Sequence, residues 1–106
     1  MKLVSIRILS GCILALSCVS GFAADPDAGK RKSAVCAGCH GPQGIAVAPN
    51  FPNLAGQNRT YLIAAIQAYQ SGKRNDPIMK GMVAALSQAD VEDLAAYFSA
   101  LPMSRP

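Results

Sequence analysis

The segment from residue 59 to residue 71 repeats apolar positions with the period of an α-helix. Its apolar side chains stand three and four residues apart: Leu62, Ala65, Ile66 and Tyr69. This spacing predicts a helix with one apolar face. Asn58 is a favourable N-cap residue, and Gly72 suits the position just after a helix. We therefore expect this helix to run from about Arg59 to Ser71.

A second helix is predicted near the C-terminal end of the chain. Its apolar residues again follow helical spacing: Val91, Leu94, Ala95, Phe98 and Leu101. Ser87 and Asp90 stand three residues apart and form a variant of the capping box, which places the start of the helix at Ser87. Pro102 is expected to end it.

A third helix is predicted ahead of these two, from about Asp27 to Ala37. Asp25 and Asp27 are candidate caps, and Pro26 fits a first helical turn. This segment ends at the cysteine motif described below.

Two segments between the helices are predicted to be loops. Glycines and prolines punctuate residues 41–57, and residues 73–81 contain Pro77 and Gly81. No part of the chain shows the alternation typical of a β-strand. The pattern therefore predicts an all-α fold with three main helices.

The first 23 residues have the pattern of a cleavable secretory signal peptide. Lys2 and Arg7 give a positive start, and residues 8–19 are largely apolar. Small residues follow, which favours cleavage after Ala23 and leaves a single domain of residues 24–106. Export of this kind predicts a periplasmic protein.

Two alternatives remain open for the signal segment. Cys12 lies in a sequence that resembles a lipoprotein cleavage site, although only four residues separate it from Arg7. Residues 8–24 also approach the lower limit of about 17 residues for a membrane-spanning helix. A lipid anchor and an uncleaved anchor are therefore kept as alternatives to cleavage.

Removal of the signal peptide changes the chemistry that the chain can offer. Two of the four cysteines leave with it, so Cys36, Cys39 and His40 are the only cysteines and histidine that remain.

The net charge of the chain also changes. The ten basic residues fall to eight against six acidic ones, and the formal charge falls from +4 to about +2. A nucleic-acid-binding domain would show a denser basic surface. A domain this small usually needs a covalent or metal staple.

The sequence Cys36-Ala37-Gly38-Cys39-His40 is the signature of covalent haem attachment. Two thiols at this spacing can each add to a vinyl group on the same edge of one haem. The imidazole of the next residue can then bind the iron. We therefore predict one covalent haem c, with the helices wrapped around it.

Three other uses of the motif compete with haem attachment. A structural zinc site usually needs four protein ligands, and the mature chain offers only Cys36, Cys39 and His40. A thioredoxin-like redox pair is expected between a strand and a helix, which this sequence does not predict. A disulfide between residues three apart would add little to the fold.

The sixth ligand of the iron cannot be a histidine of the same chain, because His40 is the only one. Methionine sulfur is another side-chain ligand that haem iron accepts. Met1 leaves with the signal and Met103 lies beyond the last helix, so Met79 and Met82 remain. Met79 follows Pro77 in the predicted loop, whereas Met82 also fits a core role.

These motifs together resemble a class I cytochrome c, and in particular one half of the two-haem bacterial cytochrome c4 and the single-haem cytochromes c5 and c553. The resemblance is carried by the haem motif and by four further stretches: 52–57, 79–82, 86–87 and 96–98. It implies that Met79 binds the iron, that the Pro52 carbonyl supports His40, and that Leu54 packs on the haem. It also implies a contact of Gly29 with Tyr97 or Phe98. Only one haem motif is present, so a two-haem relay within this chain is excluded.

The resemblance implies a single-electron carrier and not an enzyme. Redox proteins such as cytochrome bc1, an oxidase or a dehydrogenase are the expected partners. No substrate or nucleic acid is expected, and membrane contact would be transient and made through partners. A haem subunit docked on a dehydrogenase and a sensor with an open iron site are the alternatives.

Overall fold

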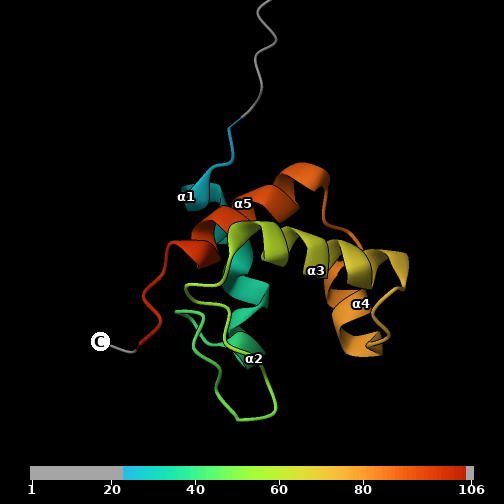
Figure 1. Cartoon of the computed structure of the whole chain (residues 1–106), viewed down its shortest axis with the longest axis horizontal. Helices are drawn as coiled ribbons and strands as arrows, with labels where there is room; N and C mark the ends of the chain where they lie inside the picture. The colour runs from blue at the N-terminus through green and yellow to red at the C-terminus, as the bar shows by residue number, and fades with distance from the viewer. Residues whose placement is uncertain (1–22, 105–106) are drawn as a thin grey trace, which may run out of the picture.

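The structure is a computed structural model that describes residues 23–104. The predicted signal peptide, apart from Ala23, lies outside the described residues. The elements are α1 (Pro26–Lys32), the 3₁₀ helix η1 (Ser33–Val35), α2 (Ala37–His40), α3 (Arg59–Ser71), α4 (Pro77–Val83) and α5 (Gln88–Ser99) (Figure 1). This part of the chain contains no strand, in agreement with the predicted all-α class. None of its helices has the length and apolar character that a membrane crossing requires.

The first and last helices, α1 and α5, cross at Gly29. A Cβ atom on this residue would overlap the carbonyl oxygen of Asp93 and lie 2.8 Å from the Cβ atom of Tyr97. The two backbones can therefore approach this closely only because α1 has a glycine here. Of the two contacts expected for Gly29, with Tyr97 or Phe98, the one with Tyr97 is present.

A polar cluster joins α1 to α5 beside this crossing. Lys32 Nζ lies 2.7 Å from Asp90 Oδ1 and 2.9 Å from Asp93 Oδ2. The backbone N–H of Asp25 donates to Asp93 Oδ1 at 2.8 Å. Lys32 lowers the pKa of Asp90 to about 2, with help from the Ser87 amide. The Asp25 amide and then Lys32 lower the pKa of Asp93, so both carboxylates are ionised at neutral pH.

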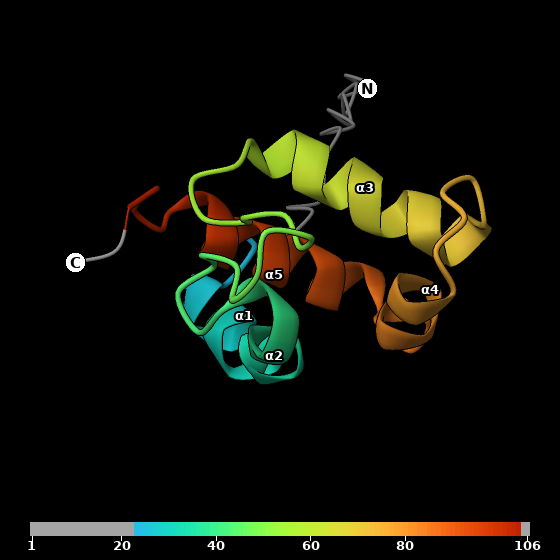
Figure 2. The same cartoon turned by 90° about the horizontal axis from the view of Figure 1, so that it is seen from below.

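Helix α3 lies alongside α5 (Figure 2) and has the predicted boundaries. Asn58 Oδ1 accepts a hydrogen bond from the Tyr61 amide at 3.0 Å, and Gly72 closes the helix with a φ of 80°. The central buried cluster joins α3 to α5 and consists of Leu62, Leu94, Ala95 and Phe98. The apolar faces predicted for these two helices therefore meet in the core.

The start of α5 is capped as the sequence predicts. Ser87 Oγ accepts from the Asp90 amide, and the Asp90 carboxylate accepts from the Ser87 amide. The helix ends at Ser99, three residues before Pro102. Pro102 therefore follows the last turn and does not itself end the helix.

The predicted continuous helix over residues 27–37 is wrong. The α-helix ends at Lys32, and one 3₁₀ turn separates it from the short helix α2. Ser33 Oγ donates to the Lys30 carbonyl at 2.7 Å, a hydrogen bond that competes with the regular α-helical pattern. The chain therefore changes direction just before the cysteine motif.

The predicted loop over residues 73–81 is also wrong, because Pro77 to Val83 form α4. Asp76 Oδ1 caps this helix by accepting from the amides of Ile78 and Met79, at 3.0 and 2.9 Å. Pro77 occupies its first turn, where a missing N–H costs nothing. Met79 is therefore presented by a helix and not by a loop.

Candidate haem site

A cavity of about 420 Å³ lies among the helices, which is within the usual size range for a small-molecule site. Helices α2 and α4, which both contribute lining residues, lie apart from each other in both views (Figures 1 and 2). All seven residues predicted for the site line the cavity: Cys36, Cys39, His40, Pro52, Leu54, Met79 and Met82. The fold therefore gathers residues that are up to 46 positions apart in the sequence.

The remaining walls are mainly apolar. Helix α3 contributes Leu62, Ala65, Ile66 and Tyr69, and α5 contributes Leu94, Ala95 and Phe98. These are the apolar positions that the helical periodicity singles out. The apolar faces of α3 and α5 thus form both the core and the cavity wall.

His40 is buried, with 6% of its surface exposed, and one of its ring nitrogens is already bonded. His40 Nδ1 lies 2.8 Å from the Pro52 carbonyl oxygen. A carbonyl only accepts, so Nδ1 carries the proton and Nε2 keeps its lone pair. The hydrogen bond predicted between these two residues is present, and it leaves Nε2 as the nitrogen able to bind iron.

The residue after this histidine has a backbone conformation that only glycine adopts readily. Gly41 has φ 81° and ψ 153°, and a Cβ atom there would overlap the carbonyl oxygen of Ile45. The chain therefore leaves α2 sharply and continues into the segment that carries Pro52.

Cys36 and Cys39 are half-buried free thiols and form no disulfide. Burial raises the pKa of the Cys36 thiol. A thioredoxin-like pair is expected between a strand and a helix, and residues 23–104 contain no strand. Among residues 23–104 no group of three or more histidine, cysteine, aspartate or glutamate side chains is placed to hold a metal ion.

Met79 and Met82 stand three residues apart on α4 and both line the cavity. Met79 is half-buried, whereas 49% of Met82 is exposed. Residues three apart share one face of a helix. Both sulfurs therefore remain candidates for the iron ligand.

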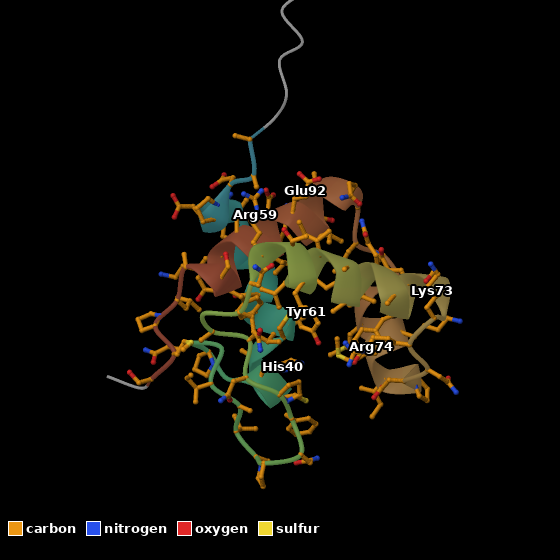
Figure 3. All side chains as sticks on the ribbon, in the orientation of Figure 1. His40, Arg59, Tyr61, Lys73, Arg74 and Glu92 are labelled. Carbon is orange, nitrogen blue, oxygen red and sulfur yellow. The ribbon has the colours of Figure 1, made fainter. Side chains whose placement is uncertain are left out.

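Several polar residues at the cavity were missed by sequence reasoning, among them Arg74 and Tyr61. Arg74 lies over the ring of Tyr69, with its guanidinium carbon 4.6 Å from the ring centroid, and Tyr61 also lines the cavity. Figure 3 shows Tyr61 on α3 between His40 and Arg74 in this view. The stacking of Arg74 on Tyr69 depends on the turn after α3, which no sequence motif marks.

Comparison with known proteins identifies the family. The model for the cytochrome c family matches residues 26–102, and the chain belongs to this family. Cytochrome c4 of Pseudomonas aeruginosa is 44% identical over 91 residues, which cover 86% of this chain and 45% of that protein. Cytochrome c-554(548) of Halomonas halodenitrificans is 45% identical over 80 residues, which cover 73% of this chain and 96% of that protein.

A solved structure supports the fold. Reduced recombinant cytochrome c4 from Pseudomonas stutzeri superposes with a TM-score of 0.72 at 44% identity, over 76% of this chain and 47% of that one. A thiosulfate dehydrogenase electron acceptor of Stutzerimonas stutzeri is 41% identical over 73 residues, covering 66% of this chain and 34% of that protein. The chain spans about half the length of the cytochromes c4 that it matches.

The residues of the cavity fit the haem c that this family carries. Cys36 and Cys39 have the spacing for two thioether bonds, and His40 keeps one ring nitrogen for the iron. Methionine sulfur stands on a different element, α4, and the walls are apolar. The cofactor of this chain is therefore one covalently bound haem c.

Proposed function

We propose that this chain is a monohaem electron carrier whose iron is closed to substrates. The observation that carries the proposal is the donor set of the cavity: a histidine with Nε2 free on α2 and two methionine sulfurs on α4. His40 and one of the two methionines would together hold the haem iron and leave it no position for a substrate. An iron coordinated in this way can gain or lose an electron but cannot bind a substrate.

The haem supplies the one-electron redox couple, and the protein side chains tune it. Cys36 and Cys39 hold the group covalently, and the Pro52 carbonyl fixes the orientation and tautomer of His40. The apolar side chains of α3 and α5 exclude water from the cavity. A dry site disfavours the extra positive charge of the oxidised iron, so we expect a comparatively high reduction potential.

The same proposal places the chain in the periplasm and gives it redox proteins as partners. The first 23 residues have the pattern of an export signal, which supports the location. A relative is named as the electron acceptor of thiosulfate dehydrogenase, which favours a dehydrogenase as the electron donor. Cytochrome bc1 and an oxidase remain alternative partners. Val35, Tyr61 and Ile78 line the cavity with 52% or more of their surface exposed, and they offer a largely apolar rim for such contacts.

A spectroscopic experiment tests the proposal. The exported protein should keep its haem after acid–acetone extraction, which removes haem that is not covalently held. Reduced protein should bind carbon monoxide slowly, because a methionine must leave the iron first. Rapid binding would instead support the alternative of a sensor with an open iron. Co-purification with a dehydrogenase would favour a docked subunit over a free carrier.

Substitution distinguishes which of the two methionines binds the iron. Met79→Ala should abolish the far-red absorption of the oxidised protein that arises from a sulfur–iron bond, and Met82→Ala should preserve it. The reverse result would identify Met82 as the iron ligand.

A further inference from the structure

A side chain of α3 that the haem site does not use holds the end of α4. Gln70 Nε2 donates to the carbonyl oxygens of Val83 and Leu86, each at a distance of 3.0 Å. Val83 is the last residue of α4, and Leu86 directly precedes Ser87, the N-cap of α5. Both amide protons of this half-buried glutamine are therefore used to fix the connection between two helices.

Helix α4 is short and packs mainly against α3. It has seven residues, which is too short for a helix to be stable by itself. Val83 is the one buried residue it contributes, whereas Ile78 is 71% exposed. Asp76 caps its first turn, and Gln70 bonds to its last residue. The placement of α4 against the rest of the fold thus depends on its packing on α3 and on the two hydrogen bonds that Gln70 donates at its C-terminal end.

Both candidate iron ligands lie on α4 between these two contacts. Met79 stands in the first turn and Met82 next to Val83, so a displacement of the helix end would move the sulfur atoms relative to His40. We propose that Gln70 is a positioning residue that keeps α4 against the cavity and thereby slows release of the methionine from the iron. The inference rests on the proposed function, and it holds whichever methionine is the ligand.

Gln70→Leu removes both N–H donors and replaces the amide by an apolar side chain of similar size. Each hydrogen bond contributes a factor of about two to twelve, so loss of both should make the open position of α4 about fivefold to a hundredfold more populated. Carbon monoxide should therefore bind the reduced haem protein of the variant at least about fivefold faster. The far-red absorption of the oxidised form should also disappear at a lower pH than in the wild type.

Gln67 provides the matched control. It stands one turn earlier on the same helix, and its Nε2 donates to Gln88 Oε1 at 2.9 Å, so this hydrogen bond joins α3 to α5 and not to α4. Gln67→Leu should leave carbon monoxide binding and the far-red absorption unchanged. If Gln70→Leu behaves like Gln67→Leu, the inference about Gln70 is overturned while the proposed function stands.

A second variant keeps the test decisive if Gln70→Leu does not yield folded haem protein. Gln70→Glu preserves the shape of the side chain but donates no hydrogen bond when ionised, and one when protonated. Carbon monoxide binding should be fast at neutral pH and slow down as the pH falls through the range of the carboxyl group. A rate equal to the wild-type rate at every pH would overturn the inference. Rapid binding by the wild type itself would overturn both this inference and the proposed function.

Discussion

Replacing Gly29 by alanine is expected to separate α1 from α5. The new methyl group would overlap the Asp93 carbonyl oxygen and lie 2.8 Å from the Tyr97 Cβ atom, where ordinary contacts begin at 3.4 Å. Since the carbonyl belongs to the backbone of α5, it cannot rotate away as a side chain would. Overpacking costs about 1–3 kcal/mol, and a backbone clash belongs at the upper end of that range. Alanine recovers about 1 kcal/mol through its helix propensity, which leaves a net loss of about 2 kcal/mol.

Thermal and urea unfolding of the haem-loaded protein measure this loss. A domain of this size loses about 4–8 °C in Tm for each kcal/mol, so the expected decrease is about 8–16 °C. Gly81→Ala is the matched control, because a Cβ atom on this helical glycine would have no neighbouring atom within 4 Å and the variant should gain up to about 1 kcal/mol. Unfolding of Gly29→Ala at the wild-type urea concentration, with an unchanged slope, would refute the close-contact argument.

Three further predictions concern stability and are measured by urea unfolding. Stability should fall between about pH 4 and pH 2, because the pKa of Asp90 is about 2 in the folded protein against 3.8 ordinarily; its contribution is complete above this window and lost below it. Lys32→Met should flatten that decline, and an unchanged acid profile would contradict the role of the ion pair. Ser87→Ala should cost about 1 kcal/mol through loss of the α5 cap, and no loss would mean that the cap is unimportant. Phe98→Ala should cost about 3–5 kcal/mol, since this side chain is 4% exposed in the core; a loss below about 1 kcal/mol would contradict that placement.

The boundaries of α3 and the start of α5 were predictable because local chemistry determines them. Asn58, Gly72 and Ser87 act on backbone groups within three residues of themselves. The apolar periodicity likewise identified the faces that meet in the core, since each face consists of apolar residues in consecutive turns of one helix. Such features need no knowledge of the rest of the chain.

Helix α4 was missed although its start signal is present in the sequence. Asp76 followed by Pro77 is a favourable N-cap and first-turn pair, but the helix has only seven residues and Gly81 lies among them. A helix so short takes most of its stability from tertiary contacts. The contacts of Gln70 span 13 to 16 residues of sequence, and no local pattern marks them.

The residues of the candidate site also fall into those that a local motif identifies and those that only the folded structure brings to the cavity. Cys36, Cys39 and His40 form a contiguous motif, so sequence alone identifies them. The pairing of His40 with the Pro52 carbonyl came from resemblance to a family, because a backbone oxygen leaves no trace in the residue type. The polar residue Arg74 could not be assigned to the cavity wall, since its place depends on stacking over Tyr69.

The backbone conformation of Gly41 has a consequence for transplanting this attachment sequence into other scaffolds. Its ψ of 153° combined with a positive φ, and the Ile45 carbonyl against it, exclude every side chain. A graft that copies the pentapeptide ending at His40 but places another amino acid next would send the following chain in a different direction. The unit that must be transferred therefore extends one residue past the histidine. In a saturation library selected for attached haem, Gly41 should tolerate as few substitutions as His40.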